Sequence, residues 1–165
     1  MRKVYLSILV FAICNVNCTA QSNKGFWQSF DIASLSVGVA GTKLVKVWGE
    51  GSSVNKAMEQ AKKNALYACL FLGLPSGNSV NATPALCVDV MAYNNNYDYF
   101  KKFFKNKGEY LNYVILKTNI VPSGDDIRHL QGGGYKVAIY VQIMYDNLRK
   151  HMEESGIIRS LNYGF

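Results

Sequence analysis

YKVAIYVQIMY, from Tyr135 to Tyr145, is the stretch of sequence that decides the fold. Its odd-numbered positions are all apolar or aromatic, and they alternate strictly with Lys136, Ala138, Tyr140, Gln142 and Met144. Side chains of a β-strand point to opposite faces at every second residue, so this period is typical of a strand. The stretch therefore predicts a strand near the end of the chain.

Three earlier segments are expected to supply the rest of a sheet. Phe30 to Val39 has mostly alternating apolar residues, and Leu44 to Trp48 is β-branched and aromatic, so Phe30 to Trp48 predicts a hairpin. A run of Tyr, Val, Ile and Thr makes Tyr110 to Val121 a further strand. The glycines and serines of Gly49 to Ser53 are expected to break the second strand and lead into a helix.

Val54 to Leu72 has the strongest helical pattern in the chain. Alanines and larger apolar residues recur at spacings of three and four, with lysine, glutamate and glutamine on the other side. A serine before the helix can cap it, Glu59 and Lys63 form an i,i+4 pair, and Gly73 ends it. We expect an α+β fold with two layers, in which this long Ala-rich helix packs on one face of a mostly antiparallel sheet.

The remaining segments are expected to contain two more helices and a connection. Asn94 to Lys107 predicts a helix with Tyr97, Phe100 and Phe104 on one side. Pro122 to Gly134 reads as a polar connection without regular structure. Asp146 is expected to cap a short last helix that ends at Gly156.

Residues 1–20 are interpreted as a cleaved signal peptide, and residues 21–165 as a single α+β domain. Two basic residues precede an apolar run of about half the 20 residues that a transmembrane helix needs, and small side chains precede Gln21. We therefore expect an exported protein of the periplasm or the outer membrane. Two alternatives stay open, an uncleaved anchor and a lipid attached at Cys18, whose flanking residues only partly resemble a lipoprotein signal.

Charge and cysteines narrow the partners and the compartment. Loss of Arg2 and Lys3 leaves 16 of the 18 basic residues against 11 acidic ones, so the net charge falls from +7 to +5. No run of five like charges marks a nucleic-acid tail, and export also argues against nucleic acid. Cys69 and Cys87 would remain after cleavage. In an oxidising compartment they are expected to form a disulfide, although a buried free thiol at Cys69 is the alternative.

The sequence contains few residues that could support catalysis. Asp125, Asp126 and His129 form its one cluster of carboxylates and imidazole, and Asp125 would share a helix face with His129 if that segment were helical. His151 is the only other histidine, so three or four convergent metal ligands are hard to assemble. We therefore expect no enzyme and no cofactor. The alternative is a small periplasmic hydrolase or metal-dependent enzyme that uses this cluster.

The densest unusual stretch interleaves aromatic rings with lysines between residues 93 and 110. Flat rings stack on sugars or insert at a membrane surface, and ammonium groups meet carboxylate or phosphate. Rings at helical spacing can instead fill a core. Beyond such a core stripe, the sequence offers a candidate binding face of six residues: Tyr93, Tyr99, Lys101, Lys102, Phe103 and Lys105.

Two blocks of the sequence resemble a known family. The segment Val45 to Gly51 with the alanine-bearing helix after it, and the late strand Gly133 to Val141, resemble small bacterial envelope lipoproteins and periplasmic domains similar to the N-terminal domain of flagellar assembly protein T. The resemblance implies a domain that builds or decorates an envelope assembly. Its expected partners are envelope proteins or an anionic polysaccharide or lipid surface.

Overall fold

The computed structural model describes residues 30–37, 40–77, 79–117 and 122–160, so the predicted signal peptide and Cys18 lie outside the described residues. The strands are β1 (Ile32–Val37), β2 (Lys43–Gly51), β3 (Val114–Leu116), β4 (Ile127–His129) and β5 (Tyr135–Ile143). The α-helices are α1 (Val54–Tyr67), α2 (Ala92–Asn95), α3 (Tyr97–Phe103) and α4 (Tyr145–Glu154). Shorter helical turns are η1 (Ala68–Leu72), η2 (Glu109–Tyr113) and η3 (Gly124–Asp126).

The predicted α+β class and antiparallel sheet are confirmed. The sheet has the order β1-β2-β5-β3, with β4 also paired to β5, and all four pairings are antiparallel. β5 pairs along its whole length with β2, from Lys43 opposite Ile143 to Gly51 opposite Tyr135. The stretch that alternates most regularly in the sequence therefore forms the strand on which the others assemble.

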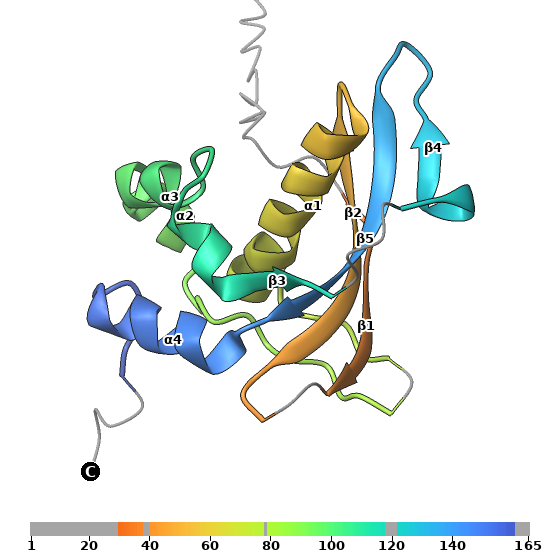
Figure 1. Cartoon of the computed structure of the whole chain (residues 1–165). Helices are drawn as coiled ribbons and strands as arrows, with labels where there is room; N and C mark the ends of the chain where they lie inside the picture. Colours follow the sequence, from red (N-terminus) through yellow and green to blue (C-terminus); the bar gives the residue numbers. More distant parts are fainter. Residues whose placement is uncertain (1–29, 38–39, 78, 118–121, 161–165) are drawn as a thin grey trace, which may run out of the picture.

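Helix α1 lies across one side of the sheet, against β2 and β5 (Figure 1). Ala57, Ala61 and Ala65 on its inner side are fully buried. Ser53 caps its first turn by accepting a hydrogen bond from the backbone N–H of Lys56 at 3.4 Å. The helical path continues as the π-helical turn η1 and ends at Gly73, whose φ of +81° suits glycine.

The expected break at Gly49 is wrong, because β2 runs through both glycines to Gly51. A Cβ built on Gly49 would lie 2.4 Å from the carbonyl oxygen of Ala57 and 2.3 Å from the amide nitrogen of Ala61. A Cβ on Gly51 would lie 2.5 Å from the amide nitrogen of Ala57. The glycines therefore serve the close approach of α1 to the sheet rather than a turn.

Three other segments differ from expectation. Tyr110 to Val121 begins as η2 and contributes only the three residues of β3 to the described sheet. Pro122 to Gly134 contains η3 and the short strand β4. The helix expected from Asn94 to Lys107 is divided into α2 and α3 and ends at Phe103. Strands of three residues are too short for a period of two to reveal them.

Asp146 lies in the first turn of α4 and does not cap it, because Met144 is the N-cap residue and no side chain caps there. The backbone N–H of Asp146 instead donates to the carbonyl of Gly41 at 3.1 Å, which ties α4 to the β1–β2 turn. The predicted end of the helix agrees with the structure, where Gly156 follows with a φ of +71°.

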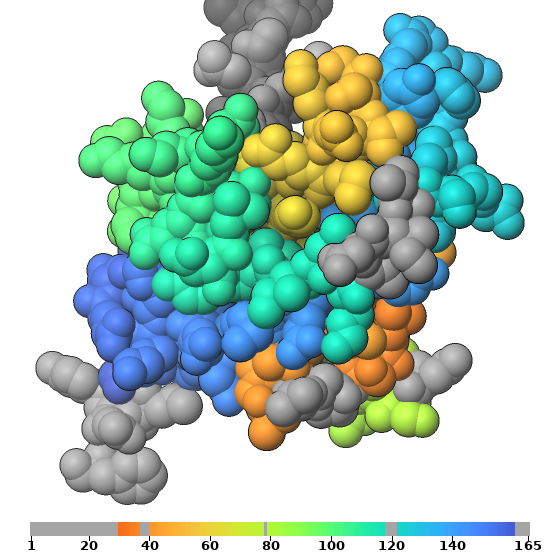
Figure 2. Space-filling view, in the orientation of Figure 1, coloured from red at the N-terminus to blue at the C-terminus, as the bar shows by residue number. Residues whose placement is uncertain are grey.

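Helices α2, α3 and α4 and the turn η2 lie on the same side of the sheet as α1, and we call them the helical lobe (Figure 1). In the space-filling view the green surface of α2 and α3 borders the yellow surface of α1 (Figure 2). Buried rings from different elements join the lobe to α1 and η1, namely Phe100, Phe103, Phe104 and Tyr110.

Candidate functional site

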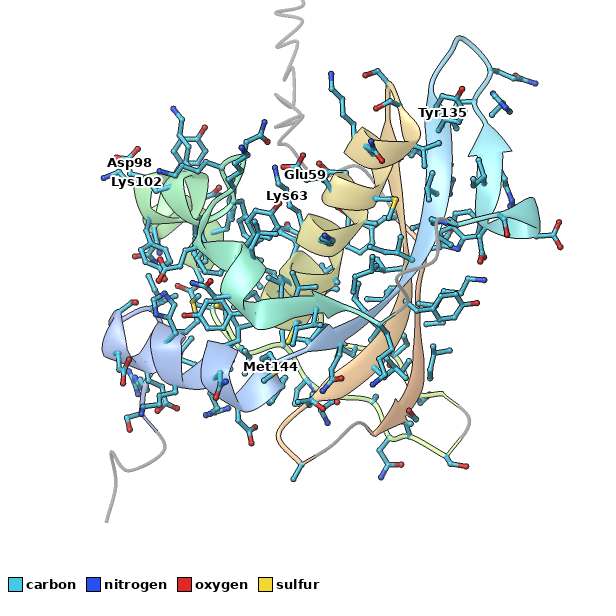
Figure 3. All side chains as sticks on the ribbon, viewed as in Figure 1. Glu59, Lys63, Asp98, Lys102, Tyr135 and Met144 are labelled. Carbon is cyan, nitrogen blue, oxygen red and sulfur yellow. The ribbon has the colours of Figure 1, made fainter. Side chains whose placement is uncertain are left out.

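The six residues of the predicted binding face lie on α2, on α3 and just after α3, but only the three lysines are fully on the surface. Lys101, Lys102 and Lys105 are exposed. Figure 3 shows Lys102 beside Asp98, on the side of α3 that points away from α1. Phe103 is 2% exposed, and its ring stacks on Tyr113 at 5.9 Å between ring centres. The expectation that Phe103 belongs to a surface patch is therefore wrong, because the ring is part of the core.

Tyr93 and Tyr99 are half-buried and packed against neighbouring rings. Tyr93 stacks on Phe100 with 5.6 Å between ring centres and 17° between ring planes. The hydroxyl of Tyr99 lies 2.8 Å from Nε2 of His151 and donates a hydrogen bond to Ser155 at 3.3 Å. Burial raises the pKa of Tyr99. These two rings therefore pack α2, α3 and α4 against one another, and they contribute to the contacts between the helices rather than lying free on the surface.

An apolar turn just before α2 is the surface feature that the sequence analysis missed. Val88 and Val90 are 92% and 93% exposed, and Met91 is 48% exposed. Asp89 fixes the turn, since its carboxylate accepts from the backbone N–H of Met91 at 2.8 Å and from the side chain of Asn95 at 3.4 Å. Exposed apolar side chains that gather at one place mark sites of interaction.

A half-exposed tyrosine connects this turn to the lysines. Tyr97 is 50% exposed and its ring lies 6.1 Å from the ring of Tyr93, which follows the turn on α2. Lys101 places its ammonium 5.8 Å from the centre of the Tyr97 ring. We call Val88, Val90, Met91, Tyr97, Lys101, Lys102 and Lys105 the lobe surface. A local cue existed, because Val88-Asp89-Val90-Met91 gathers three apolar residues in a short segment outside the helices and strands that the sequence predicts.

The structure does not bring Asp125, Asp126 and His129 together as a catalytic cluster. Asp125 and Asp126 lie in η3 and His129 at the end of β4, so the helix face on which they would meet is absent. The carboxylate of Asp126 lies 2.8 Å from Nζ of Lys46, and this hydrogen bond raises the pKa of Lys46. The ring of His129 lies 4.7 Å from that of Tyr135. Within the described ranges, no three histidine, cysteine or acidic side chains are placed to hold a metal ion.

Cys69 and Cys87 are both free thiols in the structure, so the expected disulfide is not formed. Both side chains are buried, at 1% and 5% exposure. Their segments are neighbours, since the backbone N–H of Cys87 donates to the carbonyl of Leu70 at 2.8 Å. Burial raises the pKa of Cys69 to about 12 and that of Cys87 to about 11, which disfavours the reactive thiolate.

Trp48 lies on the side of the sheet away from α1, among three cations. The guanidinium carbon of Arg128 lies 4.8 Å from the centre of the Trp48 ring. The ammonium groups of Lys46 and Lys136 lie 5.7 and 5.9 Å from the same ring centre. Carboxylates offset both lysines, through ion pairs with Asp126, Asp31 and Glu50. These residues satisfy one another, so the cluster is read as a cover for the outer face of the sheet.

Comparison with known proteins assigns the chain to no family. No family model matches it, and neither a curated protein nor a solved structure matches it significantly. The resemblance to the flagellar assembly domain therefore stays a prediction. Among the residues that the structure describes, no helix has both the length and the apolar character needed to cross a bilayer.

Proposed function

We propose that this protein is an exported, non-enzymatic binding or assembly module of the bacterial envelope. In this proposal the domain has two layers, with the Ala-rich helix α1 on one face of the sheet, and it displays the helical lobe as its contact surface. The N-terminal sequence supports export, and the resemblance to envelope lipoproteins and periplasmic domains supports the setting. The partner is another envelope protein or an anionic polysaccharide or lipid surface, without nucleic acid.

One observation carries the proposal, which is the near-complete exposure of Val88 and Val90 beside a basic helix. Burial of one valine side chain contributes about 1.5 to 3 kcal/mol, so two such side chains on a fixed turn are a substantial unused source of binding energy. Lys101, Lys102 and Lys105 add positive charge that steers an acidic partner. An apolar centre with a polar rim is the usual composition of a protein interface, so of these partners we favour an envelope protein.

The proposal is tested by crosslinking in native envelopes followed by identification of the captured partners. Two variants each change two residues of the lobe surface without touching the core, Val88→Ser with Val90→Ser, and Lys101→Glu with Lys102→Glu. We expect the first to weaken capture of the same partners at least tenfold, because two valines would no longer be buried. We expect the second to weaken capture mainly at low salt.

Ile115→Ser is the matched control, because Ile115 is an apolar residue of β3 that is 51% exposed outside the lobe surface. Its capture should equal that of the wild type. Partners that persist at wild-type levels with both lobe variants would contradict the lobe surface as the contact site. Circular dichroism of each variant tests whether the fold is kept.

A further inference from the structure

A cavity of about 370 Å³ opens between α1 and the segment that leads from α3 into η2. The side chains that matter for its chemistry are Asn55, Met58, Lys62, Asn106, Lys107 and Leu111. These residues come from two segments about fifty positions apart, so no pattern within one segment predicts the cavity. Its volume falls in the range of sites that hold small molecules.

Two of the residues that line this cavity, Glu59 and Tyr110, belong to a network of polar contacts. The carboxylate of Glu59 accepts a hydrogen bond from the hydroxyl of Tyr110 at 3.3 Å and lies 3.5 Å from Nζ of Lys63. Lys63 is only 4% exposed, and its ammonium also donates to Oδ1 of Asn106 at 3.3 Å. Figure 3 shows Glu59 and Lys63 on the side of α1 that faces the helical lobe. The one carboxylate that lines the cavity is therefore already paired with a cation.

Two of the residues that line the cavity, Lys62 and Lys107, are cations. Neither Lys62 nor Lys107 forms an ion pair with a carboxylate of the described residues. Lys107 has a φ of +55°, a left-handed conformation that costs a residue with a side chain about 1 to 2 kcal/mol. Strain of this kind persists where the surrounding structure fixes the backbone, and it clusters at binding sites.

The remaining lining groups define which anion would fit. The amide of Asn106 uses its oxygen toward Lys63, so its NH₂ group remains to donate, and the exposed amide of Asn55 can donate or accept. Met58 and Leu111 add apolar surface to the lining. Ammonium groups, amides and a small apolar area match a ligand that combines an anionic group, hydroxyls and carbon–hydrogen faces.

We infer that this cavity binds one acidic sugar unit, whose carboxylate or phosphate lies between Lys62 and Lys107 and whose hydroxyls meet Asn55 and Asn106. This site is separate from the lobe surface and shares no residue with it. It would let the module hold an anionic saccharide while the lobe surface contacts a protein partner.

The test is an NMR titration of ¹⁵N-labelled protein with its native N-terminus, at low salt. The probes are glucuronic acid, glucose 6-phosphate, glucose and inorganic phosphate. We expect one or both acidic sugars to shift the amide signals of residues 55–62 and 106–111, while glucose leaves them unchanged. Lys62→Gln with Lys107→Gln should weaken this binding at least tenfold, because both charge-assisted hydrogen bonds are lost.

Lys101→Gln with Lys102→Gln is the matched control, since it removes the same charge from α3 and should leave the titration unchanged. Absence of shifts with either acidic sugar, or shifts that survive Lys62→Gln with Lys107→Gln, would overturn the proposal. Equal affinity for inorganic phosphate and glucose 6-phosphate would show a site for anions and overturn the sugar assignment. None of these results decides whether the lobe surface binds a partner, because the crosslinking experiment tests that proposal with variants of other residues.

Discussion

Burial decides the chemistry of the two cysteine side chains that the structure describes. A thiol attacks as its thiolate, and transfer into an apolar environment disfavours the charged form. Cys69 has a pKa raised by burial from 9.0 to about 12, and Cys87 from 9.0 to about 11. Their shielded positions add a second barrier, because a reagent must reach side chains that are 1% and 5% exposed.

We expect both thiols to resist alkylation in the folded protein. At pH 8 the raised pKa lowers the thiolate fraction about a thousandfold for Cys69 and about a hundredfold for Cys87, relative to a thiol with a pKa of 9.0. Because deprotonation increases with pH, labelling should accelerate about tenfold per unit between pH 8 and 10. Mass spectrometry after timed alkylation measures this, and denaturant without reductant should expose two labelled thiols in this part of the chain. A fully protected pair under those conditions would mean that the disulfide exists.

Single residues of the candidate site were only partly predictable. The sequence identified the lysines of α3 as surface groups, because charged side chains at helical spacing seldom lie in a core. It could not separate Phe103 from an exposed ring, because Phe103 packs against Tyr113 of η2 and His151 of α4, which come later in the chain. The cavity between α1 and η2 is formed by two segments that are distant in the sequence, and the periodicity of one segment does not predict which other segment it contacts.

The close contact between β2 and α1 depends on the absence of a side chain at Gly49. Gly49 faces the backbone of α1 at the positions of Ala57 and Ala61, which are both fully buried. Each element of this contact was visible in the sequence as a strand or a helix. Glycine within the strand was misread as its end, because the same residue serves turns and close approaches.

Gly49→Ala should therefore push α1 away from the sheet. A Cβ at 2.3 to 2.4 Å from helix backbone atoms leaves no side-chain rearrangement to relieve it, so we expect a loss of about 3 kcal/mol or more. Chemical denaturation monitored by circular dichroism measures the free energy of unfolding. Ala82→Val adds carbon at an exposed position and should stay within about 0.5 kcal/mol of the wild type. A Gly49→Ala variant as stable as this control would mean that α1 lies farther from β2.

The predicted signal peptide, residues 1–20, lies outside the described residues and is tested on the whole molecule. Cleavage before Gln21 would remove Arg2 and Lys3 and give a mature chain with a net charge of +5. We expect the intact mass of protein isolated from its native envelope to match a chain that starts at Gln21. A mass that fits a diacylated or triacylated Cys18 would assign a lipoprotein instead. A chain that still begins at Met1 would contradict export by cleavage.

The place of β5 in the sheet has a consequence for how the chain folds. β5 pairs with β2, β3 and β4, and the register places Lys43 opposite Ile143, a hundred positions apart. β5 is the last of the described strands to leave a ribosome or a translocation pore. Until it emerges, the edge of β2 that pairs with β5 has no partner, and α1 can pack against β2 but not against β5. Closing so long a loop makes folding slow. A chain in which β5 has not yet paired exposes the edge of β2, which can pair with neighbouring chains. The nascent protein should therefore be most prone to aggregation and proteolysis just before β5 emerges.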